Sequence, residues 1–227
     1  MMKESENTRC IRNLTAIKGA MQVYSANYDG RFPPLFVEGE NRSPKMINGV
    51  PNTWATVIAA QMTTSFGGFS CPSAKAEENT PTLTDPAYSK ENLQVSYGMY
   101  VPRAGRPDME VSDPSTAVLL AETANFGVRK TFDVYSYRDN KSEVPYDGMS
   151  VGWDTSNFGF DARLTKSVTR LAFYNTEKGN FNSNAAETRH AKHNNYLSVD
   201  FNLRKLTPSQ AYVTTSGNRL TGIWEAR

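Results

Sequence analysis

The first 35 residues constrain the fold of this chain more than any other segment. Between Lys3 and Tyr28, apolar residues recur every three or four positions, which is the spacing of one face of an α-helix. Asp29-Gly30 then predicts the end of the helix, because glycine adopts the left-handed C-terminal conformation at little cost. Pro33-Pro34 prevents the helix from starting again. The apolar stripe consists of Ile11, Leu14, Ile17, Met21, Tyr24 and Tyr28, and we expect the first five to pack the helix on the rest of the chain.

The remaining sequence predicts a β-rich head. The 227 residues are enough for one large domain, and we expect a single one, with the helix over 1–29 and a globular head over 30–227. Aromatic residues make up 11% of the sequence, which favours packing on β-sheets. The predicted fold class is α+β, a long N-terminal α-helix packed on an antiparallel β-sheet. A short second helix is expected at 54–63, and strands are expected at 94–101, 117–122, 168–174, 195–201 and 203–206.

Charge and hydropathy narrow the classes of partner. The net charge is +2 and the basic residues are dispersed, which argues against a nucleic-acid partner. The sequence shows no run of the roughly 18 to 20 apolar residues that cross a bilayer. However, Met1-Met2 lead directly into a helix that has no N-cap residue ahead of it. We therefore expect an apolar segment to precede this helix in the natural chain.

The chain has two cysteines, Cys10 on the predicted helix and Cys71 in a predicted turn. They form either two free buried thiols or a disulfide that ties the helix to the head. An exported protein permits the bond, and the chain-entropy model gives about 4 kcal/mol of stabilisation for so long a loop. We favour the disulfide. Metal binding by the two cysteines is disfavoured, because no second pair of close ligands accompanies them.

His190 and His193 are the only histidines, and Asp200 follows them. One interpretation is a metal site made by these three side chains, since histidines three residues apart suit ligation on a helix. They lie, however, in an Asn-rich turn. We expect instead that His190 and Asp200 hydrogen-bond across a hairpin and fix its geometry.

Sequence motifs of catalysis are missing. No Gly-x-Ser-x-Gly elbow, no Gly-x-Gly-x-x-Gly fingerprint and no phosphate-binding loop occurs. A nucleophilic pair of Cys10 and His190 is the one remaining catalytic arrangement, and it is disfavoured. We therefore expect a protein that is not an enzyme and that needs no cofactor.

Four motifs follow one another along the chain. They are Glu4-Ser5 through Cys10-Ile11-Arg12-Asn13-Leu14 with Ile17, Tyr24, Tyr28, Gly30 and Phe32-Pro33; Ser70-Cys71-Pro72-Ser73; Ser96-Tyr97-Gly98; and His190, followed after nine residues by Asp200. Together they resemble the prepilin-type, pseudopilin-like family, whose C-terminal signature is His-x9-Asp-Gly. The chain departs from that family at two turns. Lys192-His193 stand where the family has Gly-Gly, and Phe201 stands where it has the glycine after aspartate.

The resemblance implies a pilin-like fold and a structural, non-enzymatic role. The chain is then the soluble part of a type IV pilus subunit or of a type II secretion-type filament subunit, and it assembles with other pilin-like subunits or with itself. Its missing N-terminal half-helix would anchor it in the inner membrane before assembly. The implied location is the cell envelope or the extracellular surface of a Gram-negative-type bacterium.

The alternative function is a surface-exposed binding or adhesion module that keeps the pilin fold and contacts host or extracellular ligands. Such a head needs exposed aromatic side chains. Loops at 74–91 and 138–166 are expected to face solvent or a partner. The candidate aromatic residues are Tyr135, Tyr137, Tyr146, Trp153 and Phe158.

Calcium is the one metal that the resemblance raises, because some minor pseudopilins hold it in a loop near the end of their sheet. Calcium takes six to eight oxygen ligands, and the spacing of the acidic residues here does not match an EF-hand loop. We expect solvated loop carboxylates instead. The residues concerned are Asp139, Glu143, Asp147, Asp154 and Asp161.

Overall fold

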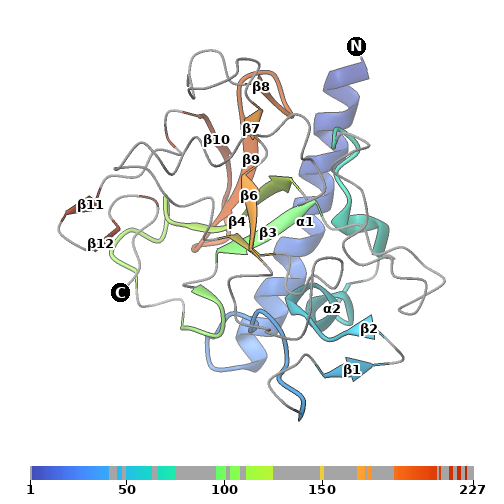
Figure 1. Cartoon of the computed structure of the whole chain (residues 1–227), viewed down its shortest axis with the longest axis vertical. Coiled ribbons are helices and arrows are strands. Elements are labelled where there is room, and N and C mark those ends of the chain that lie inside the picture. Colours follow the sequence, from blue (N-terminus) through green and yellow to red (C-terminus); the bar gives the residue numbers. More distant parts are fainter. Residues whose placement is uncertain are drawn as a thin grey trace.

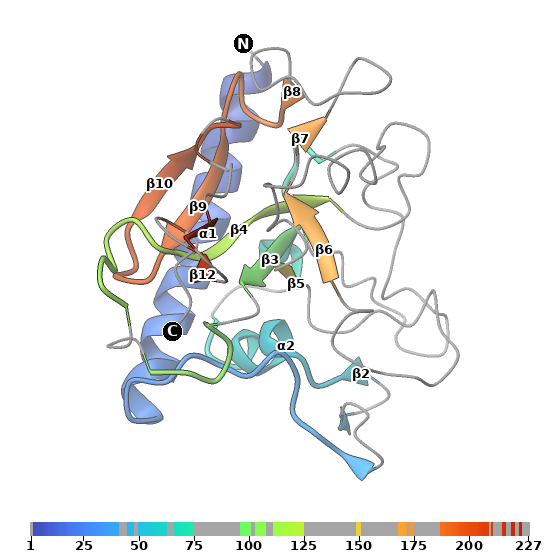
Figure 2. The same ribbon diagram turned by 60° about the vertical axis from the view of Figure 1, so that its left-hand side comes forward.

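A long helix and an antiparallel sheet make up the framework of the molecule, which confirms the predicted α+β class. The helix lies along the longest axis and packs behind the sheet (Figure 1, Figure 2). No helix within the described part of the chain is both long and apolar enough to cross a membrane. The computed structural model describes residues 2–40, 45–47, 50–62, 66–74, 96–100, 103–107, 111–124, 149–150, 168–171, 173–174, 187–208, 210, 215–216, 219–220 and 223.

Helix α1 (Met2–Asn27) buries one face against the sheet. Leu14, Ile17 and Met21 are completely buried, as expected, and Tyr24 packs half-buried against the same core. The expectation for Ile11 is wrong, because its side chain is 38% exposed. The buried stripe starts one residue earlier, at Cys10. Steps of four and three residues from Cys10 stay on one helical face, whereas each single residue turns the helix by about 100°.

The C-terminal end of α1 forms a Schellman motif. Asp29 has a φ of 53° and Gly30 a φ of 74°. The Gly30 N–H donates to the Ser25 carbonyl at 2.9 Å, which is the bond that defines the motif. The predicted glycine stop is therefore confirmed, and the first left-handed residue after the helix is Asp29, two residues beyond Asn27.

The main sheet has six strands in the order β10-β9-β4-β3-β5-β6. Neighbouring strands are antiparallel throughout this order. β3 and β4 occupy the centre, and all four residues of β3 are buried, so the one-sided apolar pattern expected for 94–101 does not hold there. The strands are β3 (Tyr97–Tyr100), β4 (Val118–Ala124), β5 (Met149–Ser150), β6 (Val168–Leu171), β9 (Asn194–Ser198) and β10 (Leu203–Leu206).

Two short helices pack against α1 and complete the core. Helix α2 (Trp54–Ala59) and the 3-10 helix η2 (Phe66–Phe69) both contact α1. The Trp54 ring is completely buried and meets the edge of Phe69 at a centroid distance of 5.8 Å. Three two-stranded ribbons complete the described elements: β1 (Met46–Ile47) with β2 (Val50–Pro51), β7 (Phe173–Tyr174) with β8 (Glu187–Thr188), and β11 (Thr215–Ser216) with β12 (Arg219–Leu220).

Candidate functional site

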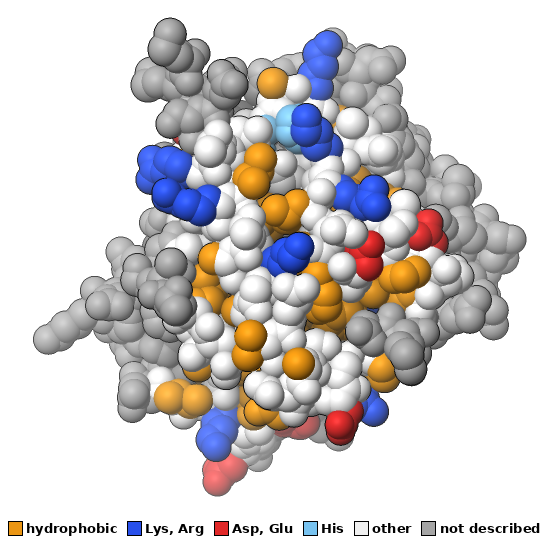
Figure 3. Space-filling view, turned by 180° about the vertical axis from the view of Figure 1, so that it is seen from behind, with side chains coloured by type: hydrophobic (Ala, Val, Ile, Leu, Met, Phe, Trp, Pro, Cys, Tyr) orange, Lys and Arg blue, Asp and Glu red, His pale blue; other side chains and the backbone are white. Residues whose placement is uncertain are grey.

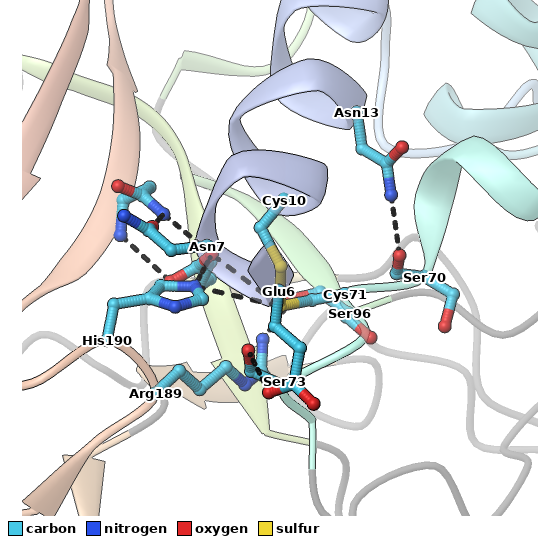
Figure 4. The surroundings of a disulfide bond; sticks show 12 residues. Glu6, Asn7, Cys10, Asn13, Ser70, Cys71, Ser73, Ser96, Arg189 and His190 are labelled. Carbon is cyan, nitrogen blue, oxygen red and sulfur yellow. Dashed lines mark hydrogen bonds and ion pairs between the residues drawn. A yellow bond between two sulfur atoms is a disulfide. The ribbon is translucent and has the colours of Figure 1, made fainter. Parts of the chain in front are cut away.

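A disulfide joins Cys10 of α1 to Cys71, two residues beyond η2 (Figure 4). Both residues are completely buried, and their Cα atoms are 5.1 Å apart, within the usual range for a disulfide. Of the two alternatives that the sequence leaves open, the structure contains the disulfide. It links positions 61 residues apart.

Glu122 and His190 lie directly against this disulfide. The Oε1 atom of Glu122, on β4, is 2.8 Å from Nε2 of His190. The Sγ atom of Cys71 lies 3.8 Å from each of these two atoms. All four side chains are buried, and one ligand atom from each lies within 4.8 Å of the others. We call Cys10, Cys71, Glu122 and His190 the Cys–Glu–His cluster.

Asn195 on β9 fixes the Glu122 carboxylate. Its backbone N–H donates to Oε2 at 2.8 Å, and its side-chain Nδ2 donates to Oε1 at 3.2 Å. The same side-chain amide donates to Asn7 of α1 at 3.0 Å. A buried carboxylate is strongly destabilising unless it is paired and hydrogen-bonded, so these bonds explain how the core tolerates Glu122.

Arg189 places a positive charge beside the cluster. Its guanidinium is buried and donates to the carbonyl of Ser96 at 2.9 Å and to the carbonyl of Thr123, the residue after Glu122. Burial raises the pKa of Tyr97 well above its ordinary value and Glu122 raises it further, while Arg189 partly opposes both. The Tyr97 hydroxyl therefore stays protonated, and it donates to the carbonyl of Cys10 at 3.4 Å.

A tight turn presents His190 to the cluster. His190 and His193 exchange backbone hydrogen bonds of 3.1 and 3.3 Å, and the two residues between them, Ala191 and Lys192, have φ values of 44° and 88°. Positive φ at both central residues is the signature of a type I′ hairpin turn. Burial lowers the pKa of His193, and Lys205 and His190 lower it further. Within the described residues, the buried Nδ1 of His190 and Nε2 of His193 have no hydrogen-bond partner.

Asp200 fixes a second turn, so the expected bond between His190 and Asp200 is wrong. Its carboxylate accepts hydrogen bonds from the Ser198 hydroxyl at 2.5 Å and from the Asn202 amide at 2.7 Å. Burial alone would raise the pKa of Asp200, but these hydrogen bonds outweigh it and the net direction is down. His190 and Asp200 act at opposite ends of β9, because the strand between them is extended.

The same turn holds Phe201 at a φ of 63°. Phe201 donates its backbone N–H to the Ser198 carbonyl at 2.9 Å, and Ser198 donates to the Asn202 carbonyl at 2.9 Å. This is a three-residue hairpin loop with a left-handed last position, where glycine is common. The Phe201 ring packs edge-on against the buried Phe32 at 5.9 Å between centroids, and this contact offsets part of the backbone strain.

Polar contacts surround the disulfide along the first part of α1. Asn13 donates through Nδ2 to the Ser70 carbonyl at 2.7 Å. The Ser73 hydroxyl donates to Glu6 Oε2 at 3.1 Å. Figure 4 shows these side chains reaching from the helix to the segment that carries Cys71. This part of α1 is therefore held by hydrogen bonds and a covalent bond.

Glu122 is not among the site residues predicted from the sequence, although the sequence contains a signal for it. It is the only charged residue in the run Val118–Ala124 of β4, and a lone carboxylate in a buried strand requires a partner. The sequence does not say which residue that partner is, because His190 and Asn195 lie 68 and 73 residues away. The candidate aromatic and acidic residues, namely Tyr135, Tyr137, Tyr146, Trp153, Phe158, Asp139, Glu143, Asp147, Asp154 and Asp161, lie outside the described residues.

The cluster therefore combines a covalent link with a buried and oriented carboxylate–imidazole pair. Its possible metal-ligand atoms are two sulfurs, one nitrogen and one carboxylate oxygen, and the two sulfurs are bonded to each other in the disulfide. Comparison with known proteins gives no counterpart: no family model, no curated protein and no solved structure matches the chain.

Proposed function

We propose that the chain is the globular part of a pilin-like or pseudopilin-like subunit, with a structural rather than a catalytic role. The observation that carries the proposal is the construction of α1. It spans the molecule along its long axis (Figure 1), buries one face against the sheet, and is tied to the head by a disulfide. A helix of 26 residues at 1.5 Å per residue is about 39 Å long.

The motifs that resemble the prepilin-type family support the same role, because they fall on this framework. Cys10 and Cys71 are bonded to each other, Ser96-Tyr97 lead into β3, and His190 and Asp200 each organise a turn of the β9 region. All of these residues hold α1 to the sheet or shape the sheet itself. A subunit built to assemble needs such a rigid connection between its helix and its head.

The outward face of α1 offers a surface for neighbouring subunits. Val23 is 44% exposed, and Ile11, on the flank of the helix beside β9 and β10, is 38% exposed, so apolar side chains are available at the surface of α1. Seen from behind, hydrophobic side chains are interspersed with basic and acidic ones on this side of the molecule (Figure 3). A mixed surface of this kind suits contacts between subunits that also have to remain separate before assembly.

The test is to express the complete open reading frame in a bacterium with a prepilin peptidase. We expect an apolar segment upstream of Met2, peptidase-dependent shortening of the chain, and recovery of the protein in sheared surface filaments. A strain with an inactive peptidase is the control, and there the chain should stay unprocessed in the inner membrane. Release of the chain by an ordinary signal peptidase, with no filament fraction, would contradict the proposal and favour the binding-module alternative.

A further inference from the structure

We infer that Cys10, Cys71, Glu122 and His190 form a tetrahedral Zn²⁺ site when both cysteines are thiols. A newly synthesised chain carries both residues in this state, before any disulfide has formed. The inference goes beyond the proposed filament role and does not rest on it, because it concerns only how α1 is held to the head.

The distances in the Cys–Glu–His cluster are close to those of a zinc tetrahedron. Zn–S bonds of about 2.3 Å and Zn–N or Zn–O bonds of about 2.0–2.1 Å imply edges of about 3.6 Å from sulfur to nitrogen or oxygen, and about 3.3 Å from nitrogen to oxygen. Cys71 Sγ lies 3.8 Å from both Glu122 Oε1 and His190 Nε2, which are 2.8 Å from each other. Three of the four ligand atoms are thus already near their positions. The two sulfurs have to separate, and Glu122 Oε1 and His190 Nε2 have to move apart by about 0.5 Å as the metal replaces the hydrogen bond between them.

The charge of such a site is balanced by a residue that is already in place. Two thiolates and one carboxylate around Zn²⁺ leave one net negative charge. Arg189 directly precedes His190 in the chain and is 7% exposed. Its guanidinium donates a hydrogen bond to the carbonyl of Thr123, the residue after Glu122. It supplies the compensating positive charge.

The residues around the ligands also fit a metal site. Asn195 donates hydrogen bonds to both oxygens of Glu122 and so fixes the direction of the carboxylate. Outer hydrogen bonds of this type orient ligands and raise metal affinity. The donor set of two cysteines, one histidine and one carboxylate is one that zinc accepts, and the complete burial of both cysteines excludes competing water.

The chemistry balances without any electron transfer. Each thiol gives up one proton as its sulfur binds. The proton between His190 Nε2 and Glu122 Oε1 moves to Nδ1 of the same ring, so one Zn²⁺ replaces two H⁺ and nothing is oxidised or reduced. Zinc then joins α1 to the segment carrying Cys71 in place of the disulfide. Later formation of the disulfide releases Zn²⁺ and passes two electrons to a disulfide donor, which leaves as a dithiol.

The first experiment uses the whole chain, reduced with a phosphine under anaerobic conditions, freed of metal and titrated with Co²⁺ as the probe. We expect one Co²⁺ per chain, with a thiolate-to-cobalt charge-transfer band and tetrahedral ligand-field bands that one equivalent of Zn²⁺ removes. The oxidised chain should show neither band. Absence of the charge-transfer band in the reduced chain, or identical spectra for the two forms, would overturn the inference.

Two variants and a matched control assign the ligands. Glu122→Gln and His190→Gln should each weaken Zn²⁺ binding by at least about tenfold, while His193→Gln, at the other end of the same turn, should bind as the parent does. Circular dichroism of the oxidised variants checks that they fold. If they do not, X-ray absorption of the zinc-loaded parent decides: two sulfurs at about 2.3 Å and two lighter ligands at about 2.0–2.2 Å are expected. A shell of sulfur alone, or of nitrogen and oxygen alone, would overturn the site, as would equal losses for His190→Gln and His193→Gln.

Discussion

The two halves of α1 are attached to the head by different kinds of interaction. The first half, up to Asn13, is held by the disulfide and by side-chain hydrogen bonds to Ser70, Ser73 and Asn195. The second half packs through Leu14, Ile17 and Met21, which are completely buried, and ends in the stacked rings of Tyr24 and Tyr28.

Because of this difference, the two halves of α1 respond to different changes. Apolar packing responds to volume and charge at each buried position, and it is insensitive to pH or redox conditions. The polar half depends on a covalent bond and on buried ionisable groups, so solution conditions alter its strength.

Leu14→Asp should cost about 5 kcal/mol or more of unfolding free energy, enough to unfold a typical domain. The reason is that the new carboxylate is buried among apolar side chains with no partner. Ile11→Asp is the matched control, and it should change stability by less than about 0.5 kcal/mol because Ile11 is 38% exposed. Equal losses in urea denaturation would show that the assignment of the buried face is wrong.

Reduction of the disulfide in metal-free buffer should cost about 4 kcal/mol, since it releases a loop closed between residues 61 apart. Thermal unfolding with and without a phosphine reductant measures the loss. The double variant Cys10→Ser, Cys71→Ser should show no response to the reductant. A parent protein whose stability is unchanged by complete reduction would mean that hydrogen bonds alone hold the polar half.

Glu122→Gln should lower stability by about 2 kcal/mol, because it weakens charge-assisted hydrogen bonds from His190 and Asn195 in a buried site. Asp200→Asn makes the same chemical change on an exposed turn and should cost less. Chemical denaturation of both variants, each with the disulfide intact, provides the comparison. A larger loss of stability for Asp200→Asn than for Glu122→Gln would show that the hydrogen bonds of Glu122 do not stabilise the buried site.

Asp29→Gly should stabilise the apolar half by about 1 kcal/mol. Asp29 adopts a φ of 53°, which glycine reaches without the strain that a Cβ atom causes. Ala26→Gly, inside the last turn of the same helix, should have the opposite sign and destabilise by a similar amount. Differential scanning calorimetry of the two variants tests both signs at once.

Acidification should weaken the turn that presents His190 to the Cys–Glu–His cluster, through His193, and this is the smallest effect. The pKa of His193 in the folded chain lies below its ordinary value of 6.5, since burial disfavours the charged form. The unfolded chain therefore takes up the proton first, so the stabilisation is complete above pH 6.5 and is lost as the pH falls below it. His193→Gln should lose less stability than the parent between pH 7.5 and pH 5.5, and identical losses in urea midpoints would exclude this role.

The sequence predicted the parts of this fold that depend on local periodicity. The helix, its glycine stop and three of its buried side chains follow from spacing alone, and Leu203–Leu206 forms a strand with the expected bounds. Ile11 is predicted on the wrong face because the larger apolar residues alone define the expected stripe. Cys10, which is completely buried, marks the true face.

The cluster was harder to predict because its members come together only in the folded chain. Glu122, His190 and Cys71 are far apart in the sequence, and no local pattern pairs them. The two turns without glycine illustrate a related limit. Local propensity argues against a left-handed Ala191, Lys192 or Phe201, yet strand pairing on both sides imposes that conformation, and the Phe201 ring recovers part of the cost through Phe32.

The position of the disulfide determines how the molecule carries mechanical load. A force that pulls the N-terminal end of α1 away from the head reaches the covalent bond at Cys10 before it reaches Leu14 or Met21. The force then passes through the disulfide and not through the 61-residue span between the cysteines. Fully extended at about 3.3–3.6 Å per residue, this span would add roughly 200 Å to the length of the chain, and the intact bond prevents that extension. The second half of α1 and its contacts with α2 and η2 lie inside this span, so this part of the chain stays unloaded under tension along that axis.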